Sequence, residues 1–347
     1  MGRIIVVGGI NMDLHLFGVR SSAGQAPLTA EHYLTEPGGK GANVARAAAR
    51  LGAGVALVGR VGDDEYGRRC VAAVRDDGVD TSAVRTTAGE PTGFVAIELV
   101  DGRHRSLLFV PGANEALTWA DVEPALAGAG PGDVIVAQAE VPPPALERLA
   151  EAAARVGAPL FLDPTPPDRV APAVVRAADV ITPNLSEAAR LVGRGEGSRL
   201  VAGIVARELV DAGARRVLVK AAEAGAVLAE RGRSLEVATL PVDAVDETGA
   251  GDVFLAALAV ERVRGADWER ASRFANVASA LSVAASGLHL PTRDAVEREL
   301  HALDGRDGPV RGPSPGDAVA ADGHRPAGSS IGRPRFRVGG AIARPAP

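Results

Sequence analysis

The sequence predicts an α/β protein built on a doubly wound, mostly parallel sheet with helices on both faces, plus a small second β-sheet. Short runs of β-branched residues alternate with alanine-rich helical patterns, which is typical of βαβ units. Two regions, at about residues 13–35 and 92–110, interrupt this alternation because they carry strand-like patterns with no helix between them. A chain of 347 residues that is 46% hydrophobic can bury a core of this size.

The strands predicted for the main sheet are short apolar segments, as expected where helices cover both faces. They cover residues 3–7, 55–61, 134–137, 159–162, 180–182 and 217–220. Helical patterns cover residues 43–51, 67–77, 145–156, 185–192 and 200–212. Residues just past the carboxyl ends of parallel strands line the ligand crevice of such folds, so candidate site residues are expected there.

The second sheet is predicted from a hairpin. Residues 93–100 and 104–110 flank Asp101-Gly102, a dipeptide typical of tight hairpin turns. We expect this hairpin, together with the strand-like segment at 13–35, to form a small sheet beside the main domain that acts as a lid.

Charge and composition argue against several classes of protein. The formal net charge is −5, which argues against a general nucleic-acid or anionic-membrane surface. No segment approaches the roughly 20 apolar residues that cross a bilayer, and the first residues do not form a secretion signal. Cys70 is the only cysteine, so no disulfide framework is possible. We therefore expect a cytoplasmic protein with neither nucleic acid nor membrane as partner.

The composition changes near the carboxyl end of the chain. From about residue 305, glycine, proline, arginine and alanine dominate without apolar periodicity. The sequence thus predicts one domain over residues 1–304 and a disordered tail over 305–347. A solvated tail is favoured over one that binds nucleic acid.

The segment Asp246-Glu-Thr-Gly-Ala-Gly-Asp252 precedes an apolar run expected to form a buried helix. A Gly-Ala-Gly turn at a helix start lets backbone N–H groups converge where the helix dipole favours negative charge. Asp252 would repel a phosphate there, so it is better placed to take a proton from a group that attacks the phosphate. A helix capped by aspartate after a glycine turn predicts the same pattern, and this segment alone leaves both interpretations open.

A second glycine-rich turn, Pro37-Gly-Gly-Lys-Gly-Ala-Asn43, opens the first helix. It lacks the spacing of a Walker A motif and has no Ser or Thr after Lys40, and Gly8-Gly9 lacks the third glycine of a dinucleotide fingerprint. The turn leaves room for a ligand on the backbone, and Asn43 offers a donor and an acceptor, which suits a polyol. The alternative is a tight turn with a solvated lysine.

Polar residues also follow other predicted strands. Asn11 and Asp13 come after the first strand and Glu140 after the strand at 134–137, and such groups bind sugar hydroxyls. Asn184 and Glu187 share one face of a first helical turn. Near a phosphate, such a pair commonly holds Mg²⁺ through waters. A capping box predicts the same spacing, and the two interpretations are compatible.

Together these segments resemble the PfkB (ribokinase-like) family of carbohydrate kinases from about residue 3 to residue 303. The motifs are Gly38–Asn43, continued by Gly59–Asp64, and Asp246–Asp252, and their joint order and separation are highly specific. The resemblance implies a ribokinase-like fold and ATP-dependent phosphorylation of a primary hydroxyl, with D-ribose as the expected sugar. The alternatives are fructose, 2-keto-3-deoxygluconate, a nucleoside, or a non-catalytic sugar or nucleotide sensor.

The resemblance also implies roles for individual residues. Asp252 would be the base, and backbone N–H groups would stabilise the transferred phosphoryl group at Gly249, Ala250 and Gly251. The sugar would be bound by Asn11, Asp13, Gly39, Lys40, Asn43 and Glu140. Asn184 and Glu187 would contact the ATP phosphates and Mg²⁺. The nucleotide would lie along Lys220, Glu223, Gly225 and Asn276. A monovalent cation such as K⁺ would lie at Asp246, Thr248, Ser282, Ala285 and Gly287. A homodimer through the lid is implied as well.

Three positions depart from the family pattern. Ala222 stands where the family usually has glycine, and its Cβ is expected to tighten the nucleotide loop. Residues 21–26 lack the usual lid motif, which weakens the assignment of the sugar. Glu247 replaces a common threonine, a change that is neutral if backbone carbonyls supply the cation ligands.

Overall fold

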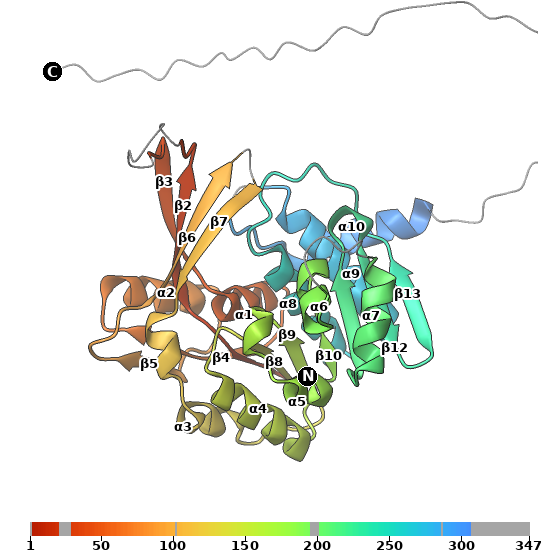
Figure 1. Ribbon diagram of the computed structural model, residues 1–347, viewed down its shortest axis with the longest axis horizontal. Coiled ribbons are helices and arrows are strands. Elements are labelled where there is room, and N and C mark those ends of the chain that lie inside the picture. The colour runs from red at the N-terminus through yellow and green to blue at the C-terminus, as the bar shows by residue number, and fades with distance from the viewer. Residues whose placement is uncertain (1, 21–28, 101–102, 195–200, 286, 307–347) are drawn as a thin grey trace, which may run out of the picture. The chain divides into compact units, whose positions relative to one another are not determined.

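The structure is a computed structural model that describes residues 2–20, 29–100, 103–194, 201–285 and 287–306, within one compact unit. The hairpin turn at 101–102, the segment 21–26 and the tail beyond residue 306 lie outside the described residues. The doubly wound sheet and the second, smaller sheet predicted from the sequence are both present (Figure 1).

The main sheet has nine strands in the order β13-β12-β11-β10-β9-β8-β1-β4-β5. Strands β1 to β11 of this sheet are parallel, and β12 and β13 add an antiparallel hairpin at one edge. Their bounds are β1 Ile4–Val7, β4 Val55–Gly62, β5 Val84–Thr87, β8 Val134–Gln138, β9 Leu160–Asp163, β10 Val180–Ile181, β11 Arg216–Lys220, β12 Ala226–Glu230 and β13 Arg233–Val237.

Helices cover both faces of this sheet because successive side chains of a strand point to opposite sides. In β1, Ile4 and Val6 join one buried cluster with α1, α2, α8, α9 and α10, whereas Ile5 and Val7 join a second with α3 to α7. The helix bounds are α1 Lys40–Arg50, α2 Glu65–Asp76, α3 Trp119–Val122, α4 Pro143–Val156, α5 Pro172–Ala177, α6 Leu185–Leu191, α7 Ala202–Asp211, α8 Ala250–Val263, α9 Trp268–Ser282 and α10 Arg293–Arg306.

The second sheet, which is predicted to act as a lid and is called the lid sheet below, has four strands in the order β3-β2-β6-β7 and rises beside the main domain (Figure 1). Its strands are β2 Asn11–Phe17, β3 His32–Gly38, β6 Gly93–Val100 and β7 Arg103–Val110. Strand β2 follows β1 after only three residues, so the lid begins directly at the carboxyl edge of the main sheet. Several large apolar side chains on it are exposed, namely Tyr33, Leu34, Leu107, Leu108 and Val110.

Some boundaries differ from the predicted ones for local reasons. Helix α1 begins at Lys40, three residues early, because Gly39 adopts a φ of 91° that starts the helix there. Helix α2 begins at Glu65 because the Asp64 carboxylate caps it by accepting the Gly67 N–H at 2.7 Å. Among the described residues, no helix combines the length and apolar character needed to span a membrane.

Candidate active site

The two glycine-rich turns bring their helices together at Asp252. This carboxylate lies in the first turn of α8, is buried, and accepts a hydrogen bond from Asn43 Nδ2 on α1 at 2.9 Å. Lys40 Nζ lies 3.5 Å from its other oxygen. Burial raises the pKa of Asp252, and the charge of Lys40 and the Asn43 hydrogen bond oppose this only in part. A buried carboxylate with a raised pKa is suited to accept a proton.

A second buried carboxylate, Asp163, lies beside this pair at the end of β9. Lys40 Nζ is 3.7 Å and Lys220 Nζ 3.4 Å from Asp163 Oδ2, and the Thr165 hydroxyl donates to Oδ1. Burial alone would raise the pKa of Asp163, but the two ammonium groups outweigh it and lower the pKa to about 2. Asp163 was not among the residues predicted from the sequence, although the strand-end rule that selected Asn11 and Glu140 applies equally to it.

The Gly-Ala-Gly turn forms the start of α8. Gly249 has a φ of 74°, which side chains rarely adopt, and the helix runs from Ala250. The Ala250 N–H donates to the Glu247 carbonyl at 3.3 Å, so this donor is engaged within the protein. An ideal Cβ on Gly251 would lie 3.0 Å from Lys220 Nζ, so an ammonium group rests against the bare backbone of the turn.

Three of the predicted sugar ligands, Asn11, Lys40 and Glu140, are joined by hydrogen bonds. Glu140 Oε2 accepts from Asn11 Nδ2 at 3.4 Å and from the Lys40 N–H at 3.2 Å. Asn114 Nδ2 donates to Asn11 Oδ1 at 2.7 Å and so fixes which way the Asn11 amide faces. The sequence analysis did not select Asn114, because its role is to orient another side chain. The predicted ligand Asn43 joins the group through Asp252.

The remaining predicted ligands pack against the same group. An ideal Cβ on Gly38 would meet Asp13 Oδ2 at 1.9 Å, and one on Gly39 would meet the Asn11 nitrogen at 2.6 Å. Burial, followed by the charge of Glu140, raises the pKa of Asp13 to about 8. Burial likewise raises the pKa of Glu140 to about 7, against the opposing charge of Lys40. Burial thus favours the protonated form of both carboxyl groups.

Asn184 and Glu187 form the capping box that was one of the two interpretations of their spacing. Asn184 Oδ1 accepts the Glu187 N–H at 2.9 Å, and Glu187 Oε2 accepts the Asn184 N–H at 2.8 Å. Thr165 Oγ1 also lies 2.7 Å from Glu187 Oε1, so its single proton can be donated either to the box or to Asp163. Over the described residues, no cluster of three or more metal-ligating side chains occurs. The carboxylate of Glu187 and the amide of Asn184 are oxygen donors, which suit an ion held through waters.

The predicted nucleotide residues lie at the end of β11, in the turn that follows it and in α9. Gly225 needs to be glycine because a Cβ would meet the Val237 carbonyl oxygen at 2.2 Å. Asn276 Nδ2 donates to the same oxygen at 2.8 Å. Ala222 adopts a φ of 48°, the left-handed conformation that glycine usually supplies, and Glu223 follows it in a short turn of 3₁₀-helix. Gly225 and Asn276 thus hold one backbone segment in place.

Asp246 links the Gly-Ala-Gly turn to the loop after α9. Its Oδ1 accepts the Thr248 N–H and its Oδ2 accepts the Gly287 N–H, both at 2.9 Å. Burial would raise the pKa of Asp246, but these hydrogen bonds lower it. The Ser282 hydroxyl donates to the Ser279 carbonyl at 2.8 Å. Ala285 is half-buried in the same loop.

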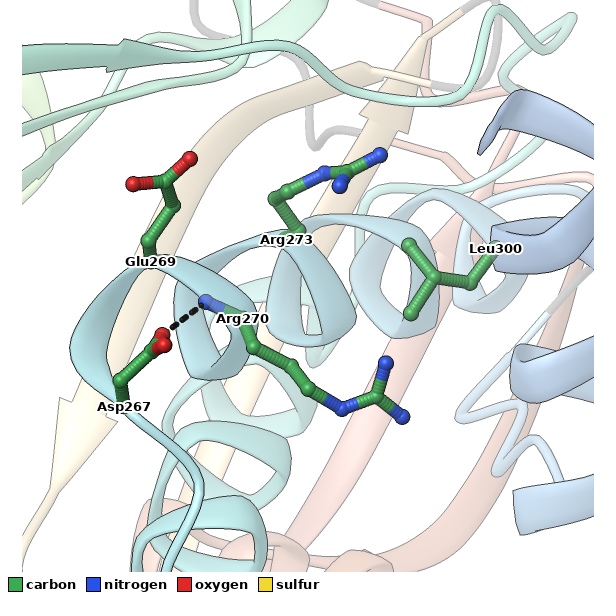
Figure 2. A pocket seen from close by; sticks show the side chains of 5 residues that line it. All are labelled: Asp267, Glu269, Arg270, Arg273 and Leu300. Atoms are coloured by element: carbon green, nitrogen blue, oxygen red, sulfur yellow. Dashed lines mark hydrogen bonds between the residues drawn. The ribbon is translucent and has the colours of Figure 1, made fainter. Parts of the chain in front are cut away.

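A hollow between α9 and α10 does not involve these residues (Figure 2). Asp267 caps α9 there by accepting the Arg270 N–H at 2.8 Å. Carboxylates neutralise both arginines that line it, since Arg270 pairs with Glu297 and Arg273 with Asp304. We therefore assign no ligand to this hollow.

Comparison with known proteins agrees with this geometry. Residues 1–295 match the pattern of the pfkB family carbohydrate kinases. Ribokinase of Bacillus subtilis (strain 168) is 35% identical over 303 residues, which are 86% of this chain and 100% of that protein. The structure of Arabidopsis thaliana ribokinase complexed with ribose and ATP superposes with a TM-score of 0.76 at 31% identity, covering 86% and 99% of the two chains. Ribokinase from Thermotoga maritima gives a TM-score of 0.77 at 29% identity, covering 87% and 100%.

Proposed function

The chain belongs to the pfkB family of carbohydrate kinases, and we propose that it transfers the γ-phosphate of ATP to the primary hydroxyl of D-ribose. The product would be ribose 5-phosphate. The observation that carries the proposal is the buried Asp252 at a Gly-Ala-Gly helix start, next to the joined polar groups of Asn11, Lys40 and Glu140. That arrangement offers a base, an anion cradle and sugar-binding groups at one place.

The proposed reaction is an in-line phosphoryl transfer. Asp252 takes the proton of the primary hydroxyl while the sugar oxygen forms a bond to the γ-phosphorus. The bond from the γ-phosphorus to the bridging oxygen breaks, and ADP leaves with that electron pair. The helix start at Gly249, Ala250 and Gly251 stabilises the negative charge of the transferred group, the Ala250 N–H exchanging its bond to Glu247 for one to phosphate.

The sugar would be held by the groups that surround Asp252. Asn11, Asp13, Asn43 and Glu140 offer donors and acceptors to its hydroxyls, and Gly39 lets the Asn11 backbone approach closely beside Lys40. Among these groups, Asp13 Oδ1 and Asn43 Oδ1 are buried without a hydrogen-bond partner in the described part of the chain, which supports the assignment because sugar hydroxyls would satisfy them.

Asn184 and Glu187 would hold Mg²⁺ through waters at the ATP phosphates, and Mg²⁺ supplies charge neutralisation there. Lys220, Glu223, Gly225 and Asn276 would line the nucleotide. A monovalent cation such as K⁺ would lie in the loop of Asp246, Thr248, Ser282, Ala285 and Gly287. This last assignment is supported by the hydrogen bonds through which Asp246 joins the loop to the phosphate turn.

A homodimer would form through the lid, and the protein would work in the cytoplasm. The exposed fractions of Tyr33 at 70%, Leu107 at 57% and Leu108 at 66% support the dimer, because an apolar surface of this kind favours a partner. The single cysteine fits a reducing compartment.

The test is an ADP-release assay over a panel of sugars and nucleosides, each with and without K⁺. D-ribose should give the highest kcat/KM, and K⁺ should raise it. Turnover of fructose, 2-keto-3-deoxygluconate, 2-deoxyribose or a nucleoside with ribose inert would overturn the assignment of the sugar. Thermal stabilisation by sugars without any ADP release would instead indicate a sensor.

A further inference from the structure

Lysine is almost absent from this chain, and its two occurrences meet at one carboxylate. Of the 38 lysine and arginine residues only Lys40 and Lys220 are lysines. Their ammonium nitrogens lie 3.7 and 3.4 Å from the same oxygen of Asp163. Elsewhere arginine makes the ion pairs, for example Arg60 with Asp121. A compact ammonium group, rather than a planar guanidinium, is therefore what these two positions share.

The two lysines approach the candidate phosphate site from different elements. Lys40 lies at the start of α1 and contacts Asp252 as well as Asp163. Lys220 ends β11, and its Nζ lies against Gly251 in the Gly-Ala-Gly turn. Gly251 has no side chain, so the ammonium group of Lys220 can sit directly above the backbone that would receive a phosphate.

The hydrogen bonds of Asp163 leave Lys220 free to change partner. Asp163 is fully buried, and it keeps the Thr165 hydroxyl and Lys40 as partners if Lys220 turns away. The Lys220 contact is long for a charge-assisted hydrogen bond, at 3.4 Å. A phosphate in the turn would thus attract Lys220 without leaving a buried carboxylate unpaired.

We propose that Lys220 is a catalytic residue that binds the transferred phosphoryl group, and that Asp163 is a positioning residue for both lysines. The proposal rests on the proposed function and deepens it, because it assigns Lys220 to the reacting phosphate rather than to the nucleotide in general. As the bond to the sugar oxygen forms and the bond to ADP breaks, the Lys220 ammonium stabilises the charge on the equatorial oxygens without giving up a proton.

The first experiment labels the unmodified protein. An ATP analogue acylated on its terminal phosphate transfers the acyl group to a neighbouring lysine amine, forming an amide and releasing ATP. With two lysines in the chain, peptide mapping gives an unambiguous site. We expect acylation of Lys220 that excess ATP suppresses. Absence of label on Lys220, or label that ATP does not suppress, would overturn the proposal. This readout needs no sugar turnover, so it is separate from the outcome of the substrate panel.

The second experiment separates a catalytic from a structural role. Lys220→Met should lower kcat about 10²–10³-fold and change the KM for the sugar less than about threefold. Lys220→Arg should recover less than about tenfold of that loss. Asp163→Asn, which keeps both lysines, should cost only about tenfold in kcat. Equal losses in Lys220→Met and Asp163→Asn would show that Lys220 serves only to neutralise Asp163, and a Lys220→Met enzyme within about threefold of wild type would equally refute the proposal.

The matched control is Arg216→Met at the other end of β11, where Arg216 pairs with Glu230. It removes a cation from the same strand and should leave kcat unchanged. Melting temperatures of all variants confirm that they are folded.

Discussion

The glycines that open α1 lie against backbone, whereas those that open α8 lie against side chains. A Cβ on Gly41 would meet the Gly8 carbonyl carbon at 2.5 Å, and one on Gly39 would meet the Asn11 nitrogen at 2.6 Å. On the α8 side, a Cβ on Gly249 would meet only the Leu288 side chain, and one on Gly251 only the end of Lys220. Similar sequence patterns therefore serve different purposes, close internal packing at α1 and an accessible backbone at α8.

The largest effect should come from the carboxylate where the two turns meet. Asp252→Asn removes the proposed base but keeps the shape of the side chain, so kcat should fall about 10³-fold while the protein remains folded. ADP release with saturating ribose measures the loss, and a melting curve serves as the control. A variant that keeps turnover within about tenfold of wild type would show that neither turn supplies a base.

In the turn that opens α1, an added methyl group should lower the stability of the protein. In Gly41→Ala the new carbon overlaps the backbone of Gly8, which cannot move without displacing β1, so the free energy of unfolding should fall by about 3 kcal/mol. Urea denaturation of the two proteins gives the difference. If the stability were unchanged, the close approach of α1 to the sheet would not be what requires glycine at this position.

The acid next to the α1 turn should make stability depend on pH. Since the folded-state pKa of Asp13 is raised from 3.8 to about 8, the folded protein keeps a proton that the unfolded chain releases above pH 4. The contribution of Asp13 to the free energy of unfolding should therefore fall as pH rises through this window, by about 2 kcal/mol between pH 6 and 8, and Glu140, whose pKa is raised to about 7, adds to this fall. Denaturation at both pH values measures it for the ligand-free protein. Asp13→Asn should flatten the slope, and an equal slope in that variant would assign the proton to another group.

In the turn that opens α8, an added methyl group should leave the stability of the protein unchanged but weaken ATP binding. Gly251→Ala meets only the flexible end of Lys220 and replaces glycine within a helix, so stability should change by less than about 0.5 kcal/mol. The methyl group would occupy the space above the turn, and the KM for ATP should rise about tenfold. Steady-state kinetics alongside denaturation checks both halves. If the variant lost stability but kept its KM for ATP, the glycine at the start of α8 would serve packing rather than ligand access.

The smallest effect is expected at Ala222, which stands in the turn after β11 where the family usually has glycine. Ala222 adopts a positive φ, which costs a side-chain residue about 1–2 kcal/mol. Ala222→Gly removes this strain, but it also gives the unfolded chain more freedom, worth about 0.5–1 kcal/mol. The net gain in the free energy of unfolding should be about 0.5 kcal/mol, measurable by urea denaturation. A clear loss of stability would mean that the Ala222 methyl group makes a contact that outweighs the strain.

Most of the main sheet could be predicted because its strands are short runs of β-branched residues between alanine-rich helices. The hairpin of β12 and β13 was missed, although Arg231-Gly232 between two strand-like runs is a turn signal. Its first strand, Ala226–Glu230, contains two alanines and so carries little β propensity. Helix α1 started early because Gly39 could take a φ that propensity does not reveal.

The site was predictable where residues follow strand ends or motifs, as for Asn11, Glu140 and Asp252. Asp163 follows a predicted strand and could have been selected by the same rule, whereas its partners, like that of Asn114, lie in distant parts of the chain. Asp163 forms ion pairs with two lysines that are 180 residues apart in sequence, and only the folded sheet brings these lysines together. Asn114 acts by fixing another amide, which no spacing rule encodes.

The short connection between β1 and β2 divides the candidate sugar site between two bodies. Asn11 and Asp13 belong to the first strand of the lid sheet, whereas Glu140 and Asp252 belong to the main domain. A sugar held by both sets would link the second sheet to the main domain. Its binding free energy would then depend on the angle between the two. Its apparent affinity would then include the free energy of bringing the lid to that angle, and any change that stabilises that position would tighten binding without touching the sugar.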